Sequence, residues 1–334
     1  MIKIITKYDD IDKAQWNDLL YNRSDVASFF QSPDAYELFE HFDWAESVVV
    51  AVEENNLLTG VVVSTLFHEG KGIMRRLTSR AIVNGGPLLD KNISPGALES
   101  LLSTTVALLE KKCIYIETRN FNDYSRWKKN FEKCGFSYQP HYNFHIDTSN
   151  PELIEKRFSS SRRYEIRQSL KNGAYIDQNK DCIPGFYAIL HNLYKTKIHV
   201  PLFPLDFFQH LSQQPYCKIF IVHDATGRTI GGQVSLFLSG KVGYSWFCCG
   251  LDHEYKKIHP SVLAFFSGIR YTADNCYPIF DMMGAGSPND GGYGVRDFKA
   301  QFGGKLVEHG RYLYLCRPMI YKAAKWALHF RKKL

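Results

Sequence analysis

The sequence predicts an α/β protein of two tandem domains, each with a mixed sheet and its own helices. Two stretches, residues 47–76 and 218–247, both read as strand, polar turn, strand, glycine-containing turn and strand. Aligning Gly60 with Gly231 gives an offset of 231 − 60 = 171 residues, about half of the 334-residue chain. An offset of this size indicates an internal duplication.

Both halves then continue in the same order. A helical apolar pattern is followed by a short apolar strand, a second helix that ends on glycine, and a last strand. In the first half these elements fall on residues 95–112, 113–118 and 124–148, and in the second on residues 259–275, 277–284, 295–304 and 305–316. Each half therefore has the order β-β-β-α-β-α-β.

The segment between the halves begins with a turn signal and continues as a basic helix to Gly173. We place the domain boundary near Asn150, which gives domains 1–150 and 151–334. The second domain then includes this basic connector helix and a basic C-terminal helix.

This order of elements, with the "CGF" turn before the last strand, resembles the GNAT N-acyltransferase fold. Two such units joined by "SRRYEIRQSLKNGA" and followed by "FDMMGAG", "DFKAQFGG" and "RPMIYKAAK" resemble the FemA, FemB and FemX family of peptidoglycan-bridge aminoacyltransferases. The early segment "FFQSPDAYELFEHF" also matches, so the resemblance covers nearly the whole chain. The helical arm of some members has no counterpart here, and the compact FemX-like form is the closer match.

The resemblance implies a catalytic role for Phe298 and Lys299, which correspond to a pair proposed to stabilise the oxyanion of the acyl-transfer intermediate. A fixed cation near that oxygen lowers the barrier. The glycines of the preceding loop, Gly284 and Gly286 among them, would let a substrate approach the backbone closely. Alternatively, Phe298 and Phe302 lie in the core and Lys299 faces solvent.

Other candidates surround this loop. Asp281 ends a strand and could orient the incoming amine or take its proton, although a strand-end aspartate often caps a turn. Tyr244 and Trp246 alternate on a strand and could line a substrate groove or pack in the core. We also expect Tyr293 to contact substrate.

The sequence lacks a motif that acyl-CoA-dependent enzymes of this fold contain, and this bears on the identity of the acyl donor. Acyl-CoA users of the GNAT type have a glycine-rich loop that holds the pyrophosphate at a helix N-terminus, but "DHEYKKIHPSVL" contains Pro260 and no glycine. Coenzyme A is therefore disfavoured and no cofactor is expected. The resemblance implies aminoacyl-tRNA as donor. The basic connector, with Arg162, Arg163 and Arg167, could contact tRNA phosphates or be a solvent-facing helix.

For the acceptor, family members that act on a nucleotide-linked muramyl peptide use a lysine in the segment matching "QSPDAYELFE", which has none here. They also use an arginine in the second domain, where this chain offers Lys195 and Lys197. A lipid-linked peptidoglycan precursor is therefore expected rather than a nucleotide-linked one.

The charge pattern and the cysteine content indicate the cellular compartment of the protein. No uncharged run reaches the length of a membrane span and the N-terminus is too charged for a signal peptide, so we expect a cytoplasmic protein. The eight cysteines show no CxxC pair and no metal-ligand spacing. The net charge of the chain is +7. The last thirty residues contain eight Lys or Arg and one acidic residue, so this segment alone has a net charge of +7.

The C-terminal segment has the pattern of an amphipathic helix, with Met319, Ala323, Trp326 and Phe330 in one stripe. We expect this stripe to pack on the domain and the cationic face to associate weakly with an anionic membrane at the inner surface of the cell. The alternative is a helix that only seals the second domain.

We expect an enzyme that transfers an amino acid from charged tRNA to an amine of a peptidoglycan precursor. One alternative is an acyl-CoA-dependent N-acyltransferase acting on a cell-envelope polysaccharide or its precursor. The other is a non-catalytic protein that binds RNA or a membrane surface.

Overall fold

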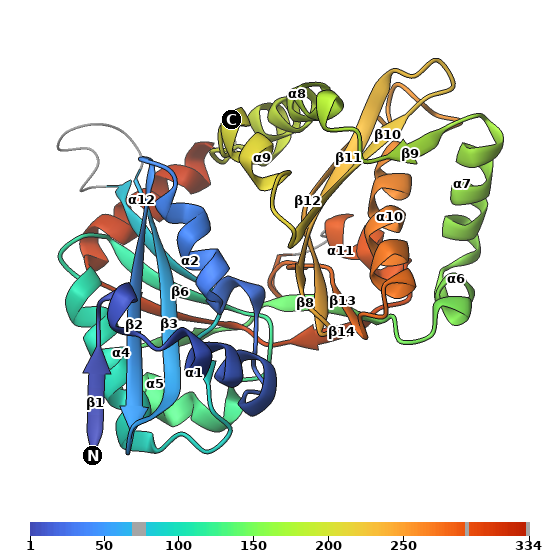
Figure 1. Cartoon of the computed structure of the whole chain (residues 1–334). Coiled ribbons are helices and arrows are strands. Elements are labelled where there is room, and N and C mark those ends of the chain that lie inside the picture. Colours follow the sequence, from blue (N-terminus) through green and yellow to red (C-terminus); the bar gives the residue numbers. More distant parts are fainter. Residues whose placement is uncertain (69–77, 291–293, 332–334) are drawn as a thin grey trace. The chain divides into compact units, whose positions relative to one another are not determined.

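A computed structural model describes residues 1–68, 78–290 and 294–331 of the chain (Figure 1). The chain forms two compact units, of which the first comprises Met1–His141 with Glu308–Leu334 and the second comprises Tyr142–Val307. Each unit has a mixed sheet and its own helices, so the predicted α/β class is confirmed. The strand expected after Gly70 falls partly on residues outside the described ranges.

The first unit is built on a sheet with the strand order β1-β2-β3-β4-β6-β15-β7, in which β5 also pairs with β3. Its strands are β1 (Ile2–Ile5), β2 (Ala45–Glu54), β3 (Leu57–Phe67), β4 (Arg80–Gly85), β5 (Leu88–Leu89), β6 (Tyr115–Asn120), β7 (Ser137–Gln139) and β15 (Arg311–Leu315). Its helices are α1 (Lys13–Asp18), α2 (Pro33–Glu40), α4 (Pro95–Leu109), α5 (Lys128–Lys133) and α12 (Pro318–Arg331).

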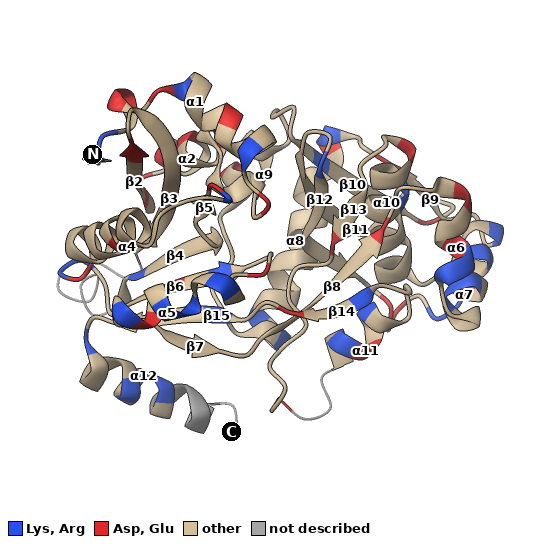
Figure 2. Ribbon diagram, turned by 90° about the horizontal axis from the view of Figure 1, so that it is seen from below, with Lys and Arg blue, Asp and Glu red and all other residues tan. Residues whose placement is uncertain are grey.

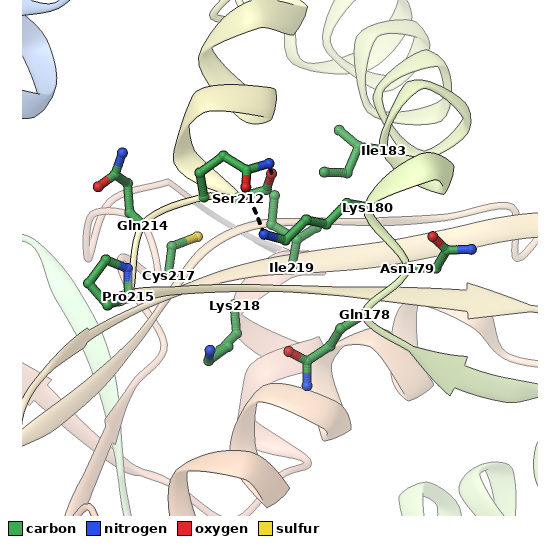
Figure 3. Close-up of a pocket in the computed structure, with 11 residues that line it drawn as sticks. Gln178, Asn179, Lys180, Ile183, Ser212, Gln214, Pro215, Cys217, Lys218 and Ile219 are labelled. Carbon is green, nitrogen blue, oxygen red and sulfur yellow. Dashed lines mark hydrogen bonds between the residues drawn. The ribbon is translucent and has the colours of Figure 1, made fainter.

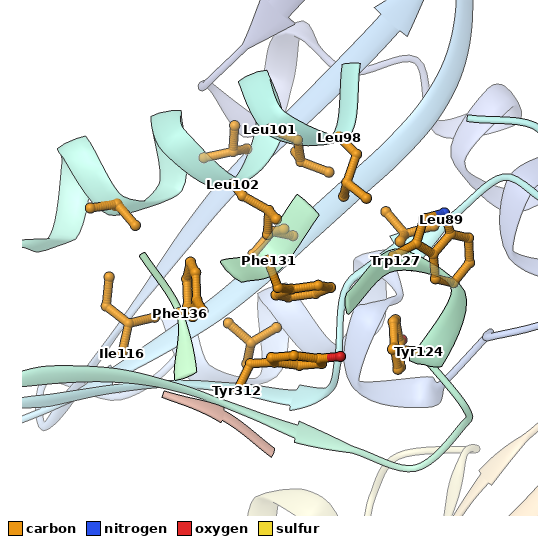
Figure 4. Close-up of a cluster of buried hydrophobic side chains, with 14 of the residues drawn as sticks. Leu89, Leu98, Leu101, Leu102, Ile116, Tyr124, Trp127, Phe131, Phe136 and Tyr312 are labelled. Atoms are coloured by element: carbon orange, nitrogen blue, oxygen red, sulfur yellow. The ribbon is translucent and has the colours of Figure 1, made fainter. Parts of the chain in front are cut away.

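The core of the first unit lies between α4, α5 and the sheet (Figure 4). The helix α4 begins at Pro95 because the Ser94 side chain accepts a hydrogen bond from the backbone of Ala97. Phe131 from α5 stacks on Tyr312 from β15, with ring centroids 4.0 Å apart. A residue near the end of the sequence therefore completes the core of the first unit.

The second unit has the strand order β14-β8-β13-β12-β11-β10-β9. Its strands are β8 (Tyr142–Asp147), β9 (Tyr175–Asp177), β10 (Cys217–His223), β11 (Thr229–Leu238), β12 (Val242–Gly250), β13 (Ile279–Asp281) and β14 (Lys305–Glu308). Its helices are α6 (Ile154–Arg157), α7 (Ser160–Lys171), α8 (Ile183–Leu193), α9 (Leu205–Leu211), α10 (Pro260–Asp274) and α11 (Gly294–Ala300).

The core of the second unit is centred on α10, which packs on the sheet. Phe265 of this helix contacts the rings of Phe280 and Phe302. Gly268 lies so close to the sheet that an added Cβ would stand 2.1 Å from Nε2 of the buried Gln233. The absence of a side chain at this position therefore lets α10 lie close to β11.

Each sheet contains one strand that the other half of the sequence supplies. β15 lies between β6 and β7 in the first sheet, and β8 lies between β13 and β14 in the second. The pattern predicts a single last strand in each half, but in the structure each is interrupted, at residues 140–141 and 309–310, and its two parts join different sheets. Pro140 has no N–H to donate and Gly310 has a φ of 63°.

This strand exchange differs from the expected boundary near Asn150. The strand β8 precedes that boundary but pairs with β13, and β15 follows it but pairs with β6 and β7. The C-terminal helix α12 likewise belongs to the first unit and not to the second. The expected single connector helix is also interrupted, since α6 ends at Arg157 and α7 begins at Ser160 after a Ser159 cap.

The cysteines are all free thiols in the structure. A membrane-spanning helix is not found in the described part of the chain, where no helix has both the length and the apolar character of a span.

Candidate functional site

The second unit contains two parallel strands that pair over only a short length. β13 pairs with β12 at Val242, Gly243 and Tyr244. Among the described residues no other strand pairs with the rest of this side of β12, Ser245–Gly250, which we call the β12 edge. In the first unit the corresponding strands β4 and β6 stay paired over Ala81–Gly85. A strand edge of this kind can bind an extended ligand through its N–H and C=O groups.

The β12 edge begins at a β-bulge. Val234 of β11 pairs with Phe247, and the next residue, Ser235, pairs with Ser245, so Trp246 has no opposite residue on β11. A bulge bends the strand and changes the direction of its side chains. The expected simple alternation of Tyr244 and Trp246 on one face is therefore interrupted between them.

Three side chains form a row across the sheet where the β12–β13 pairing ends. Tyr244 pairs with Asp281, and Asp281 pairs with His145 of β8. Paired residues on neighbouring strands point to the same face of a sheet. The structure thus brings two predicted residues, Tyr244 and Asp281, together with a histidine that the sequence analysis did not select.

Asp281 is 1% exposed and is held by several donors. Its Oδ1 accepts hydrogen bonds from Nδ2 of Asn143 (2.7 Å) and from the backbone of Met283 (2.7 Å), and its Oδ2 lies 3.1 Å from Nε2 of His145. Burial lowers the pKa of His145, but the charge and hydrogen bond of Asp281 raise it by more, against opposition from Lys305, so the net shift is upward. Asp281 and His145 therefore form a carboxylate–imidazole pair.

Lys299 is buried, with 7% of its surface exposed. Its ammonium donates to the carbonyl oxygens of Met282 (2.5 Å), Met283 (2.9 Å) and Gly284 (2.7 Å). Burial lowers the pKa of Lys299 to about 8, against the attraction of the Asp281 carboxylate. The alternative that placed Lys299 on a solvent face is wrong, because α11 turns this side chain onto the loop that follows β13.

The loop that Lys299 contacts has an unusual backbone. Met283 has a φ of 52°, a value that non-glycine residues seldom adopt, and Gly284 and Gly286 both have a φ of 77°. The side chain of Asn143 also accepts a hydrogen bond from the backbone of Gly284 (3.1 Å). The side chains around the loop thus hold a strained conformation that the sequence alone would not favour.

Phe298, the predicted partner of Lys299, packs away from the loop carbonyls. Its ring contacts Phe265 and Phe302 in the core, and the guanidinium of Arg162 lies 4.4 Å from the ring centroid. Phe298 therefore fixes the position of α11, on which Lys299 stands.

Of the predicted tRNA-binding arginines, one is buried and one is exposed. Arg162 is 7% exposed and forms an ion pair with Glu165. Arg163 donates to the backbone carbonyls of Lys156 and Phe158. Only Arg167 of the three is classed as exposed. Figure 2 shows Lys and Arg gathered along α6 and α7.

The remaining predicted substrate residues fall into three groups. Trp246 packs against Phe203 and Phe207. Lys195 and Lys197 are exposed on the short helical turn Tyr194–Ile198. Tyr293 lies outside the described residues.

The N-terminus of α10 follows the β12 edge and is already occupied by a carboxylate. Asp252 accepts hydrogen bonds from the backbone N–H of Ser261 (3.1 Å) and from its hydroxyl (2.5 Å). The first residue of the helix, Pro260, has no N–H. A pyrophosphate at a helix N-terminus accepts hydrogen bonds from such N–H groups, and here one of them already donates to the Asp252 carboxylate.

Each unit also has a hollow away from these residues. The one in the second unit, of about 160 Å3, is lined by residues 178–180, 183, 212–215 and 217–219 (Figure 3). There the ammonium of Lys180 donates to Gln213 (2.9 Å). In the first unit a wider hollow, of about 530 Å3, includes Arg23, which is paired with Asp18 and Asp90. Neither contains a predicted site residue.

Sequence reasoning missed His145, Asn143 and Asp252. One signal was present for the first two, because the strand sequence "YNFHID" alternates polar Asn143 and His145 with apolar Phe144 and Ile146. Their polar face therefore needed a partner. That the partner is Asp281, 136 residues further along the chain, follows only from the sheet.

The chain has known relatives in fold. Residues 157–299 match the acetyltransferase (GNAT) domain family. The crystal structure of FemX superposes with a TM-score of 0.72 at 13% identity, covering 96% of this chain and 99% of that one. A tandem GNAT protein from the clavulanic acid biosynthesis pathway gives a TM-score of 0.57 at 10% identity, with coverages of 95% and 99%. L-PGS from Bacillus licheniformis gives 0.54 at 12% identity, with 92% of each chain covered. A search of curated proteins by sequence finds no match.

The domain match over residues 157–299 and the superposed structures show that the chain has the GNAT acyltransferase fold. Within this class, the chain has the FemX-like tandem GNAT fold, as the resemblance implied.

Proposed function

We propose that the protein is an aminoacyltransferase that moves an amino acid from charged tRNA to an amine of a peptidoglycan precursor. The observation that carries this proposal is the loop after β13, which Asp281 and Lys299 hold next to the β12 edge in a FemX-like fold. The reaction is acyl transfer, and the site provides a carboxylate–imidazole pair and a buried cation for it.

In the proposed reaction, the amine lone pair attacks the carbonyl carbon of the aminoacyl ester. A C–N bond forms, the ester C–O bond breaks, and the terminal ribose oxygen of tRNA leaves with a proton. His145 takes the proton of the amine and returns it to the leaving oxygen. Asp281 fixes the orientation and tautomer of the imidazole.

Lys299 supplies the positive charge for the oxyanion in this proposal. Its three carbonyl contacts fix the ammonium before substrate arrives, and a preorganised charge needs little rearrangement during the reaction. Its charge also acts on Cys248, a residue of the β12 edge. An acyl carbonyl bound along this edge would therefore lie in the field of Lys299.

Aminoacyl-tRNA is favoured over acyl-CoA as the donor. The carboxylate of Asp252 occupies the helix terminus at which a CoA pyrophosphate would bind. The exposed cations of the α6–α7 segment, which include Arg167 and Lys171, offer contacts for tRNA phosphates. As acceptor we propose a lipid-linked precursor, because the segment "QSPDAYELFE" has no lysine to bind a nucleotide diphosphate.

The test is to incubate the full chain with a mixture of charged tRNAs and lipid-linked precursor and to measure the mass of the product. The expected result is a mass increase of one amino-acid residue on the precursor. A parallel reaction uses acetyl-CoA in place of charged tRNA. Product only in that second reaction would contradict the aminoacyl donor and support an acyl-CoA-dependent N-acyltransferase.

A further inference from the structure

Three residues in the apolar stripe of the C-terminal helix α12 are exposed. Met319 is 79% exposed and Trp326 is 67% exposed, and Ala323 between them is also exposed. The expectation that this stripe packs on the domain is therefore wrong for these three residues, and the side chain of Phe330 lies outside the described part of the structure. The helix contacts the first unit through a different face, where the ring of Tyr321 meets that of Tyr115 at a centroid distance of 5.4 Å.

Two exposed cations lie along one side of the apolar stripe. Met319, Ala323 and Trp326 follow the spacing i, i+4, i+7 that places them on one side of a helix, and Lys322 and Lys325 lie beside them. From residue 316 to the C-terminus the sequence contains six Lys or Arg and no Asp or Glu. Figure 2 shows the cations of α12 without acidic neighbours along the helix.

We propose that this face of α12 docks on the surface of an anionic lipid bilayer. The side chains of Met319 and Trp326 enter the boundary between headgroups and acyl chains, and Lys322 and Lys325 remain at the level of the lipid phosphates. Tryptophan is favoured at that depth because its ring has an apolar body and one N–H donor. Lysine can extend its stem along apolar surface while its ammonium stays in water.

The combination of groups decides between a bilayer and other anionic or apolar partners. An RNA backbone would satisfy the lysines but would leave Met319 in water. A second copy of α12 would cover the apolar stripe but would bring like charges together. An anionic bilayer matches both the stripe and its cations, as it does for amphipathic helices that lie in the membrane interface.

Vesicle binding tests the proposal without any transfer reaction, so it is independent of the proposed function. The full chain is sedimented with vesicles of phosphatidylglycerol and phosphatidylcholine, and with vesicles of phosphatidylcholine alone. We expect binding to the anionic vesicles and a blue shift of the fluorescence that is lost in the Trp326→Phe variant. The double variant Met319→Ser/Trp326→Ser should bind roughly tenfold less or weaker still.

Two further variants separate the charges from the apolar stripe. Lys322→Gln/Lys325→Gln should weaken binding at low salt and have little effect at high salt, because salt screens the charges. The matched control is Leu170→Ser, which removes a 47% exposed apolar side chain beside the cations of α7 and should leave vesicle binding unchanged.

Some outcomes would overturn the proposal. These are equal binding of the wild type and the Met319→Ser/Trp326→Ser variant, or equal loss of binding in the Leu170→Ser control. Loss of dimerisation or of RNA binding in the α12 variants, with no vesicle binding by the wild type, would assign the face to another partner.

Discussion

Asp281 and Lys299 hold the same residue from its two sides. The Asp281 carboxylate accepts a hydrogen bond from the N–H of Met283, and the Lys299 ammonium donates one to the carbonyl of Met283. The positive φ of Met283 is therefore fixed by two charged groups that also attract each other. The loop and the Lys299 ammonium form one structural element, so a change of Asp281 or Lys299 should disturb the loop.

Replacing Lys299 should impair catalysis more than binding. We expect Lys299→Ala to lower kcat by roughly two to three orders of magnitude and to change KM only a few-fold, because the charge acts mainly in the transition state. Lys299→Arg should rescue only part of the rate, since a guanidinium places its charge differently. Steady-state kinetics with the donor and acceptor identified by product mass test this. An alanine variant at full rate would remove Lys299 from the mechanism.

The pH dependence of the rate should report His145 and Lys299. His145 must be neutral to take a proton, so kcat/KM should rise with pH through a midpoint above about 6.5, the ordinary value for histidine. Lys299 must be charged, so the rate should fall as the pH passes about 8. His145→Gln should remove the acid limb and leave the alkaline limb, and Lys299→Arg should do the reverse. An unchanged acid limb in His145→Gln would mean that His145 does not titrate in the reaction.

The contribution of His145 to the stability of the protein should also depend on pH, and it should be larger at low pH than at high pH. Because the pKa of His145 is raised in the folded state, its pairing with Asp281 stabilises the protein fully below the unfolded-state pKa and is lost as pH rises through the folded value. The free energy of unfolding of the wild type, relative to His145→Gln, should therefore be larger at about pH 6 than at about pH 9. The other charged groups near the pair are Lys299 and Lys305. Urea unfolding at both pH values measures the difference.

Coenzyme A should bind weakly because of Asp252. We expect the wild type to show no saturable binding of desalted CoA up to roughly millimolar concentration. A dissociation constant at that limit would correspond to a binding free energy of only about 4 kcal/mol. Asp252→Asn should strengthen CoA binding by removing a charge from the helix terminus. Asp274→Asn, at the other end of α10, serves as the matched control. Tight binding of CoA by the wild type, measured by calorimetry, would argue for the acyl-CoA alternative.

Substitutions of exposed residues in the connector helix α7 should affect tRNA binding, and substitution of a buried residue should affect stability. Arg167→Glu with Lys171→Glu should weaken tRNA binding and reduce its dependence on salt, because both side chains are exposed. Arg162→Gln should instead lower the free energy of unfolding, by about 2 to 4 kcal/mol, since it leaves Glu165 without its buried partner. Filter binding at two salt concentrations and urea unfolding distinguish the two effects. Unaltered tRNA affinity in the first variant would make α7 purely structural.

The glycines at the two ends of α11 should respond differently to alanine. Gly303 has a φ of 73°, and a Cβ added there would lie 2.3 Å from the carbonyl oxygen of Arg157. Gly303→Ala should therefore lower the free energy of unfolding by at least about 2 kcal/mol. Gly294 has no neighbour within 4 Å of an added Cβ, so Gly294→Ala should stay within about 0.5 kcal/mol of the wild type. Equal effects in thermal unfolding would contradict this local account of strain.

Much of the fold could be predicted because its elements have local signals. The alternation around Gly60 and Gly231 predicted the strands, helical apolar spacing predicted α4 and α10, and helices ending on glycine predicted α5 and α11. The FemX-like fold was indicated by motifs in their order along the chain, and the structural comparison confirms it. The strand exchange could not be predicted, because an alternating pattern shows that a strand has a buried face but does not specify the sheet it joins.

The site was predictable only in part. Lys299 was selected from the family resemblance and Asp281 and Tyr244 from local sequence, and the structure places all three around one strand end. Their roles stay predictions. The pairing of Asp281 with His145 depends on sheet register between distant segments, and no local pattern contains it. The inward position of Arg162 and the outward stripe of α12 were missed for a related reason, since periodicity defines the faces of a helix but not their neighbours.

The exchange of β8 and β15 constrains how the protein is made on the ribosome. Arg311 of β15 contacts Glu117 of β6, a residue that precedes it by 194 positions. At a translation rate of about 5 to 20 residues per second, the first sheet waits roughly 10 to 40 s for its missing strand. During that time β6 and β7 are nascent edges with unpaired N–H and C=O groups, which are prone to aggregation. Newly made chains should therefore depend on chaperones until their last residues emerge.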